Sequence, residues 1–293
     1  MHYLIGERDC DGIARTLFAP GGAAAPLGDA ANRASASRAY ARFLAQLQPS
    51  IPMQPEFGVV LIDDSAFENA IIDAFYHESP LDDLPRYRDR TFFENGPEYR
   101  AAIAADVAWL DEAMSRFPVH DPAFWTSFGF FVNYILCPYS RYSRGGSDSA
   151  AIGALFISRP RSYSARDLYE ILVHEFTHTV MFLDEQVDRH YADETLMAQP
   201  DHYARAAISG TARPLDKVLH SLVVATEVLL HRDHVLGHDG ATMIHPPTPE
   251  LLRNMALTID SIRELDRRDD LLADRGLDLV DRCAGVVSAM TRA

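Results

Sequence analysis

The chain has 293 residues, of which 47% are hydrophobic and 24% charged, the composition of an ordinary soluble globular protein. Its formal net charge of −15 argues against nucleic acid as a partner, because phosphate binding requires a basic surface. The sequence contains neither a signal-peptide pattern nor an apolar run long enough to span a membrane, so we expect a cytoplasmic protein without a membrane partner.

The first half of the chain is expected to be mainly helical. Apolar residues recur with helical spacing in three segments, at 34–48, 65–77 and 97–118. The segments 20–31 and 78–94 are rich in Gly and Pro or in charge, and we expect them to be irregular. The run GVVLI at 58–62 is either a short buried strand or the start of the helix that follows it.

The second half is expected to alternate between strand, helix and loop. A polar loop at 139–149 precedes the apolar run AIGALFIS, which predicts an edge strand at 151–158. Ser164 followed by Asp167 indicates a helix start, because a serine cap and an acidic residue three positions later satisfy free N–H groups of the first turn. The predicted helices are 167–187, 215–231, 249–266 and 269–291, with loops at 188–212 and 232–249.

Together these elements predict one domain over 1–293 with a predominantly α-helical α+β fold, in which a small β-sheet packs on a helical bundle. A zincin-like core is one form of this fold. The motifs distinguish three parts of the domain. These are a mostly helical N-terminal part of unassigned role (1–149), a metal-binding core (150–231) and C-terminal helices (249–291).

The most informative motif is HExxH, formed by His174, Glu175 and His178. On a helix the two histidines lie one turn apart and about 40° from each other around the axis, so their rings can converge on one metal ion. The glutamate between them can reach a water bound to that ion. The surrounding residues are apolar, which indicates a buried helix, and buried imidazoles need partners. We therefore expect a metal site rather than a chance occurrence of the motif.

A third ligand is expected from the helix at 215–231. His220, Glu227 and His231 fall on one stripe of this helix, at i, i+7 and i+11. His220 and Glu227 are the two candidates, and a glutamate would complete the two-histidine, one-glutamate set of a thermolysin-like zinc site. Asp184 is a weaker candidate, because the HExxH helix has no glycine that would turn the chain back toward the metal.

Three histidines follow this second helix, namely His234, His238 and His245. They lie with irregular spacing in a segment rich in Gly and Pro, so we expect solvated loop residues and not a second metal site. We expect His231 to be an ordinary polar residue.

The helix sequence LYEILVHEFTHTVMFL, preceded by the strand LFIS and followed by RPLDKVLHSL, resembles the HExxH-motif peptide-modification proteins that accompany ribosomally made natural-product precursors. Some members of that group are 2-oxoglutarate-dependent peptide β-hydroxylases. The resemblance covers roughly 150–230. It implies that His174, His178 and His220 hold Fe(II), that 2-oxoglutarate is the co-substrate, and that the partner is a precursor peptide or a carrier-bound residue.

A 2-oxoglutarate site also requires a cation for the distal carboxylate, for which a bidentate arginine is well suited. Arg213 is the first candidate, and Arg159 and Arg161 beside the strand end are the second. In this interpretation Glu175 does not bind the metal itself; it either contacts the residues that do or holds the substrate.

The alternative is an HExxH zinc metallopeptidase, in which Zn(II) lowers the pKa of its bound water, Glu175 is the general base and the glutamate of the second helix is the third ligand. Such an enzyme needs an oxyanion donor, for which Tyr203, His202 and Arg213 are candidates. In either case an extended peptide is expected to pair with the strand at 151–158. A third hypothesis, a binding protein with a degenerate site, fits the intact motif least.

Overall fold

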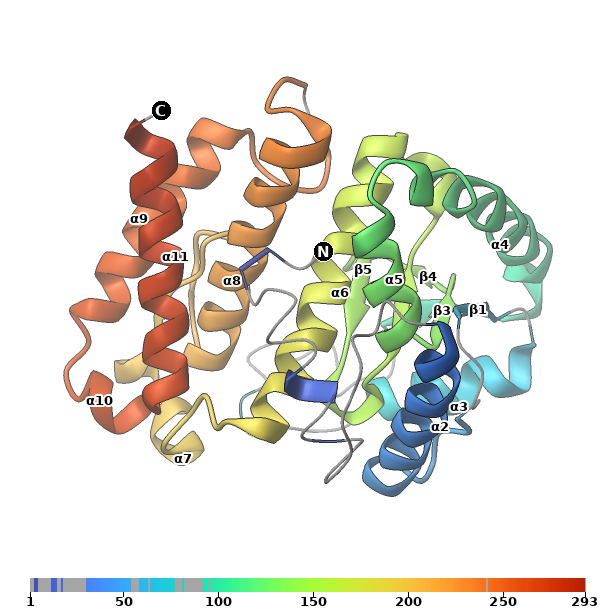
Figure 1. Cartoon of the computed structure of the whole chain (residues 1–293), viewed down its shortest axis with the longest axis horizontal. Coiled ribbons are helices and arrows are strands. Elements are labelled where there is room, and N and C mark those ends of the chain that lie inside the picture. Colours follow the sequence, from blue (N-terminus) through green and yellow to red (C-terminus); the bar gives the residue numbers. More distant parts are fainter. Residues whose placement is uncertain are drawn as a thin grey trace.

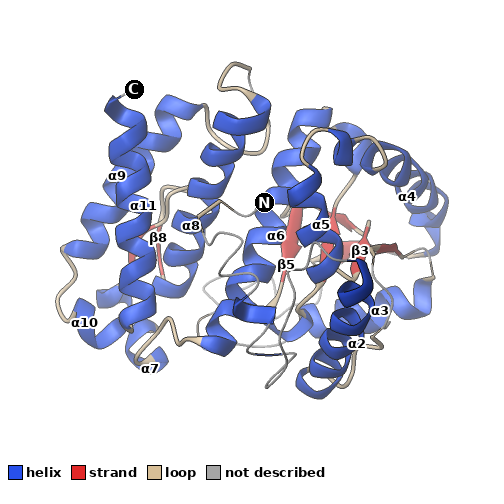
Figure 2. Cartoon of the chain, in the orientation of Figure 1, coloured by secondary structure: helices blue, strands red, loops and turns tan. Residues whose placement is uncertain are grey.

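We describe the protein from a computed structural model. The structure describes residues 3–4, 12–14, 17, 30–53, 58–62, 64–76, 81, 92–94, 96–240 and 242–292. The segments 20–31 and 78–94, predicted to be irregular, lie largely outside these residues. Within the described part of the chain, helices outweigh strands and the sheets are small (Figure 2), which confirms the predominantly helical α+β fold.

The N-terminal helices form where the apolar spacing predicts them. They are α2 (Ala30–Leu47), α3 (Ser65–Phe75), α4 (Arg100–Met114) and α5 (Pro122–Phe131). Helix α3 begins at Asp64, whose carboxylate accepts the N–H of Phe67, and α5 begins in the same way with Asp121 and Phe124. Such caps satisfy N–H groups that the first turn of a helix leaves free.

The central sheet has the strand order β1–β3–β6–β5. Its strands are β1 (Val60–Leu61), β3 (Tyr134–Leu136), β6 (Ala154–Ile157) and β5 (Gly145–Ser147). The first three are parallel, and β5 runs antiparallel to β6. The prediction of an edge strand at 151–158 is therefore wrong in one respect, because β6 is paired on both sides. The edge is β5, which lies in the segment predicted to be a polar loop.

The alternation of side chains along the strands divides the sheet between two cores. Tyr134 and Phe156 belong to the smaller core, together with Phe75 of α3. Ile135 and Leu155 belong to the larger core, which also contains apolar side chains of α5 and α6 (Ala165–Val187). Because both faces are covered, the inner strands are continuous apolar runs rather than alternating ones.

Helix α6 carries the HExxH residues and lies between the sheet and α8 (Leu215–His231) (Figure 1). The start of α6 is the predicted capping box, in which Ser164 and Asp167 each bond to the backbone N–H of the other. Near its start α6 contacts the end of α8, and near its end it contacts the start of α8, so the two helices are antiparallel. The predicted bounds of α8 are confirmed.

The C-terminal helices α9 (Thr248–Arg263) and α11 (Asp274–Arg292) cover α8 on the side away from the sheet (Figure 1). The short helix α10 (Arg268–Leu271) lies between them in the sequence and contacts α7. The remaining elements are short, namely β2 (Phe93–Glu94) paired with β4 (Tyr139–Ser140), α7 (Glu194–Met197), β7 (Ala204–Arg205) paired with β8 (Ala212–Arg213), and a π-helical turn at Arg232–Leu236. Among the described helices, none combines the length and the apolar character needed to cross a membrane.

Candidate functional site

Three side chains of α6 lie close enough to share a metal ion. The potential ligand atoms of His174, Glu175 and His178 all lie within 4.8 Å of one another. The Nε2 atoms of the two histidines are 3.2 Å apart. Two nitrogens bound tetrahedrally to one ion at their usual bond length would be separated by about 3.3 Å. The spacing of the two imidazoles therefore fits a transition-metal ion, and it suits zinc and iron alike.

A series of hydrogen bonds lies behind His174. Its Nδ1 is 2.8 Å from Nε2 of His245, and Nδ1 of His245 is 3.0 Å from Oε2 of Glu170. Arg232 holds the same carboxylate through two bonds of 2.8 and 2.9 Å. Burial would raise the pKa of Glu170, but hydrogen bonds from His245 and Arg232 outweigh it and lower the pKa to about 2.

This series determines which nitrogen of His174 faces the metal position. The ionised carboxylate of Glu170 can only accept, so His245 donates to it. Burial lowers the pKa of His245, and the neutral ring then accepts at its other nitrogen, from His174. Nε2 of His174 is left as an acceptor directed at His178. This is the tautomer that binds a metal, and partners of this kind orient metal-binding histidines in proteins.

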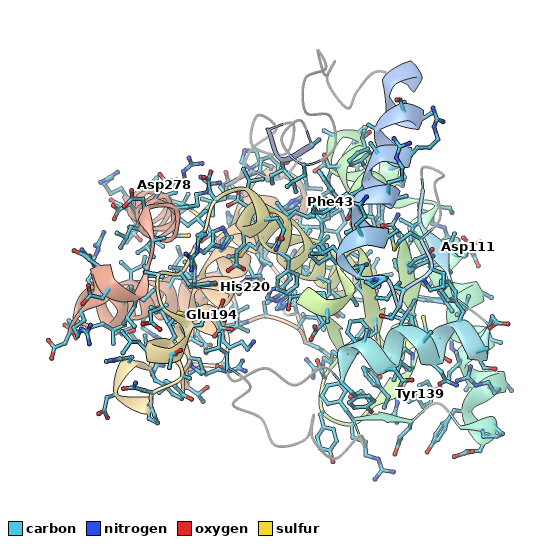
Figure 3. All side chains as sticks on the ribbon, turned by 90° about the horizontal axis from the view of Figure 1, so that it is seen from below. Phe43, Asp111, Tyr139, Glu194, His220 and Asp278 are labelled. Carbon is cyan, nitrogen blue, oxygen red and sulfur yellow. The ribbon has the colours of Figure 1, made fainter. Side chains whose placement is uncertain are left out.

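His220, from α8, stands behind His178. Its Nδ1 is 2.8 Å from Nδ1 of His178, and the two rings stack with their centroids 5.1 Å apart. Phe182 lies against both rings. Figure 3 shows His220 in the interior, between the C-terminal helices and the part of the molecule that contains the sheet. The structure thus places the predicted third histidine in contact with His178 but outside the cluster formed by the HExxH residues.

Burial sets the charge of these groups. It lowers the pKa of His174, His178 and His220 well below the usual value, so the three imidazoles are neutral, the form that binds metals. Burial also raises the pKa of Glu175 to about 8, although a hydrogen bond from Ser147 acts in the opposite direction. A cation beside Glu175 would favour its ionised form.

The edge strand β5 lies directly against Glu175. The hydroxyl of Ser147 donates to Oε2 of Glu175 at 3.0 Å. A Cβ atom at Gly145 would lie 2.8 Å from Oε1 of the same carboxyl group, so a residue with a side chain would displace one of the two. The absence of a side chain at Gly145 is what permits this close approach.

The free edge of β5 presents main-chain groups at the site. The N–H of Ser158 donates to the carbonyl of Arg144 at 2.8 Å. Hydrogen-bonded positions alternate in an antiparallel pair, so the next such position on β5 is Gly146. The N–H groups of Gly145 and Ser147 consequently point away from β6, and no described strand pairs with them.

An open cleft of about 740 Å³ leads to His174 and Glu175. Three arginines line it, Arg141, Arg144 and Arg159. The guanidinium of Arg141 pairs with Glu94, and that of Arg159 lies over the ring of Tyr139, 4.7 Å from its centroid. Arg144 forms no ion pair with any carboxylate of the described residues.

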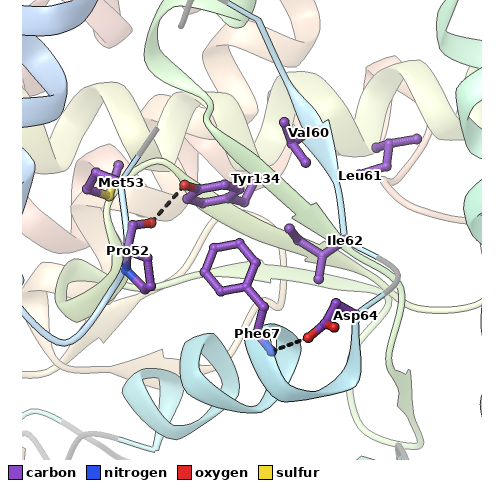
Figure 4. A pocket seen from close by; sticks show the side chains of 8 residues that line it. All are labelled: Pro52, Met53, Val60, Leu61, Ile62, Asp64, Phe67 and Tyr134. Carbon is purple, nitrogen blue, oxygen red and sulfur yellow. Dashed lines mark hydrogen bonds between the residues drawn. The ribbon is translucent and has the colours of Figure 1, made fainter. Parts of the chain in front are cut away.

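A smaller hollow of about 450 Å³ lies at the opposite edge of the sheet, beside β1 (Figure 4). Its walls are mainly apolar and include Phe67 and Tyr134. The carboxylate of Asp64 is used there to cap α3, and the hydroxyl of Tyr134 donates to the carbonyl of Pro52. The cleft at α6 is therefore the candidate active site.

The three predicted arginines are placed differently. Arg213, in β8, is half-buried, and after burial its charge is one of the causes that lower the pKa of His178. Arg159 lines the cleft. Arg161 pairs instead with the buried carboxylate of Asp106 on α4. The structure brings Arg159 to the cleft and turns Arg161 away from it, and Arg213 is not among the residues that line the cleft.

The carboxylates considered as third ligands point elsewhere. Glu227 is fully buried, accepts the backbone N–H of Leu4 and lies 3.9 Å from Nε2 of His231. Asp184, near the end of α6, pairs with Arg275 of α11. Neither belongs to the cluster formed by the HExxH residues.

The prediction for the loop histidines is wrong at His245, which is buried against His174 and Glu170, whereas His234 and His238 are exposed as expected. Glu170 was also missed. It stands one turn before His174 on the same stripe of the helix, and this spacing was a usable signal. No sequence pattern distinguished the residues of the edge strand, since their position depends on the fold.

No protein-family model matches the chain, and no curated protein is significantly similar to it. What the structure contains is a cluster of two half-buried histidines and one buried glutamate at the end of an open cleft, within a predominantly helical α+β fold.

Proposed function

We propose that the protein is a non-haem Fe(II)- and 2-oxoglutarate-dependent oxygenase that hydroxylates a side-chain carbon, the β-carbon, of a peptide or amino-acid residue in natural-product maturation. The observation that carries the proposal is the pair of facing imidazoles, 3.2 Å apart, at the end of an arginine-lined cleft. In this proposal His174, His178 and His220 are the three histidines of the metal centre, and α6 with the sheet forms a zincin-like core.

The cationic groups around the histidines support a carboxylate co-substrate. Bound iron and 2-oxoglutarate would supply the oxidising chemistry, while the protein binds and orients both substrates. The distal carboxylate of 2-oxoglutarate needs a cation that is held near the metal. Arg213 is the best placed of the predicted arginines, because its charge acts on His178 from the α8 side and leaves the open cleft to the peptide.

The edge of the sheet supports a peptide substrate. An extended peptide that pairs with the outward N–H groups of Gly145 and Ser147 would pass over His174 and Glu175. In this proposal the peptide pairs with β5 and not with the strand that was predicted at 151–158. Glu175, hydrogen-bonded to Ser147 beneath the edge, is in position to hold the peptide.

The first experiment requires no knowledge of the peptide. Fe(II) and 2-oxoglutarate are added to the protein without oxygen, and the visible charge-transfer band of an iron–2-oxo acid chelate is recorded. We expect the band in the wild type and in the surface variant Arg116→Gln, and its loss in His174→Ala. Admission of oxygen should then produce succinate. Absence of both the band and succinate would refute the oxygenase.

One observation favours a second candidate, the zinc metallopeptidase. Glu175 lies beside both histidines and beneath the sheet edge, where a general base would act on a bound peptide. The oxyanion donors considered for it, His202 and Tyr203, are not among the residues that line the cleft. Glu175→Gln separates the two functions, because it should abolish peptide cleavage but preserve the charge-transfer band. Cleavage by the zinc form together with absent succinate would establish the peptidase.

A further inference from the structure

We propose that the cleft selects peptides that carry an acidic side chain, Asp or Glu, a few residues from the one that lies over His174 and Glu175. The inference rests on the proposed function only for the position of the reacting residue. The basis for the acidic side chain is a pair of arginines, Arg144 and Arg159, which we call the cleft arginines.

The cleft arginines leave the sheet at the same end. Arg144 directly precedes β5 and Arg159 directly follows β6, and the first residue of β5, Gly145, pairs with the last residue of β6. The close approach of β5 to Glu175 occurs at this same end, at Gly145. A peptide that follows the edge of β5 would therefore run from the metal position toward both guanidinium groups.

The positive charge of the cleft arginines is not neutralised by the protein. Of the described residues that line the cleft, Glu175 is the only carboxylate, and it is buried and bonded to Ser147. Neither Arg144 nor Arg159 forms an ion pair with a described carboxylate. Arg141 also lines the cleft, but its guanidinium forms an ion pair with Glu94.

This local excess of positive charge contrasts with the rest of the chain. The protein has a formal net charge of −15 and more carboxylates than basic side chains. At physiological ionic strength their field is screened beyond about 8 Å. A ligand in the cleft would therefore respond to the guanidinium groups that face it rather than to the distant acidic surface.

The backbone of Arg159 has the left-handed conformation that favours glycine. Arg159 has φ = 53°, and Arg267 is the only other non-glycine residue of the described part with a positive φ. For a residue with a Cβ atom this left-handed conformation costs about 1 kcal/mol, and glycine would adopt it freely. The arginine nevertheless occupies the position, with its guanidinium ordered over the ring of Tyr139 at the cleft.

The geometry limits where the acidic residue stands. A strand advances about 3.4 Å per residue, so the reach of an arginine next to Gly145 corresponds to two or three peptide residues. Tyr142 and Met243, which are 48% and 52% exposed, lie at the same rim. They offer apolar contacts, and we expect an apolar residue near the acidic one in the selected peptides.

The test is a selection of randomised short peptides by display on the immobilised full-length protein. It compares the wild type with the double variant Arg144→Gln/Arg159→Gly and with the control Arg116→Gln/Arg263→Gln, which removes two surface arginines. Glycine at 159 relieves the left-handed backbone and so protects the fold. We expect Asp and Glu to be enriched by the wild type and the control, and not by the cleft variant.

A selected peptide is then measured by fluorescence anisotropy against its copy with amide in place of carboxylate. The wild type should bind the acidic peptide about tenfold more tightly, the expected gain from a charged hydrogen bond at a partly exposed site. The cleft variant should bind both peptides equally. The proposal is overturned if the wild type enriches no acidic residue, or if the cleft variant enriches them equally.

A second measurement separates the two sources of carboxylate. The cleft variant is titrated with 2-oxoglutarate by means of the charge-transfer band. If its affinity for 2-oxoglutarate falls while acidic peptides are still selected, the cleft arginines hold the co-substrate and the inference is wrong. If the wild type shows no band but selects acidic peptides, the oxygenase fails and the inference stands.

Discussion

The hydrogen bond between His174 and His245 allows the metal site to be tested through a residue that does not touch the metal position. His245→Phe removes both ring nitrogens and keeps a planar ring of similar size. Glu170 would retain its two bonds from Arg232, so no buried charge loses its counter-charge. Glu170→Gln is less suitable, because it leaves Arg232 buried without an anion, a change that costs about 3–5 kcal/mol.

The expected magnitudes follow from the two bonds that His245 makes. Each is a buried hydrogen bond, and its loss reduces the free energy of unfolding by about 1 kcal/mol. This is a tolerable change for a domain of this size. His174 would also lose the partner that sets its tautomer and ring orientation. Loss of such a partner weakens metal binding by about 10–100-fold, or about 1.4–2.7 kcal/mol. Because two such bonds are lost, stability should fall by about 2 kcal/mol, which is similar to the change in metal binding, so metal affinity and stability are measured separately.

The assay is a competition for Zn(II) or Co(II) between the protein and a chromophoric chelator at neutral pH, accompanied by thermal melting of the metal-free protein. The matched control is His238→Phe, since His238 is exposed on the same segment and contacts Thr248 and Asp233. The control should bind metal as the wild type does. Unchanged affinity in His245→Phe, or an equal loss in the control, would show that His245 does not orient His174.

Three further predictions concern the edge strand, the end of α6 and the third ligand. Gly145→Ala should reduce activity at least tenfold, because the new methyl group would lie 2.8 Å from Oε1 of Glu175, whereas Gly285→Ala, where nothing lies within 4 Å, should leave activity unchanged. Burial raises the pKa of Asp184, but hydrogen bonds from its partners outweigh this and hold it below its usual value. The wild type should therefore have a larger free energy of unfolding than Asp184→Asn above about pH 4, and this difference should disappear as the pH falls. Urea unfolding measures it, and a difference that grows with acidification would contradict the prediction. His220→Ala should weaken metal binding and Glu227→Ala should not, and the reverse result in a metal titration would make Glu227 the ligand.

The helices could be predicted because their signals are local. The apolar stripe of α8 and the capping box of α6 both lie within a few residues of the feature that they specify. The same holds for His220, which stands on a regular stripe of α8, so its direction follows from helical geometry alone.

The edge strand and His245 could not be found in this way. Gly-Gly-Ser has little strand propensity, and β5 forms where β6 offers hydrogen bonds and where Gly145, which has no side chain, fits against Glu175. His245 meets His174 across 71 residues of sequence. Nothing in its immediate neighbourhood separates it from the exposed histidines of the same segment. In both cases the decisive contact is non-local, and local patterns do not encode it.

The edge of the central sheet that lies against Glu175 is formed by β5 and is three residues long, Gly145–Ser147. It offers about 10 Å of main chain. A strand of another copy of the protein could form few main-chain hydrogen bonds with so short an edge, and this protects the sheet from aggregation. A peptide would therefore be recognised by only a few consecutive residues, and the residues before and after them would not affect its binding. A long substrate containing several matching segments would then be modified at each of them in turn, and the number of modifications would be set by the substrate and not by the enzyme.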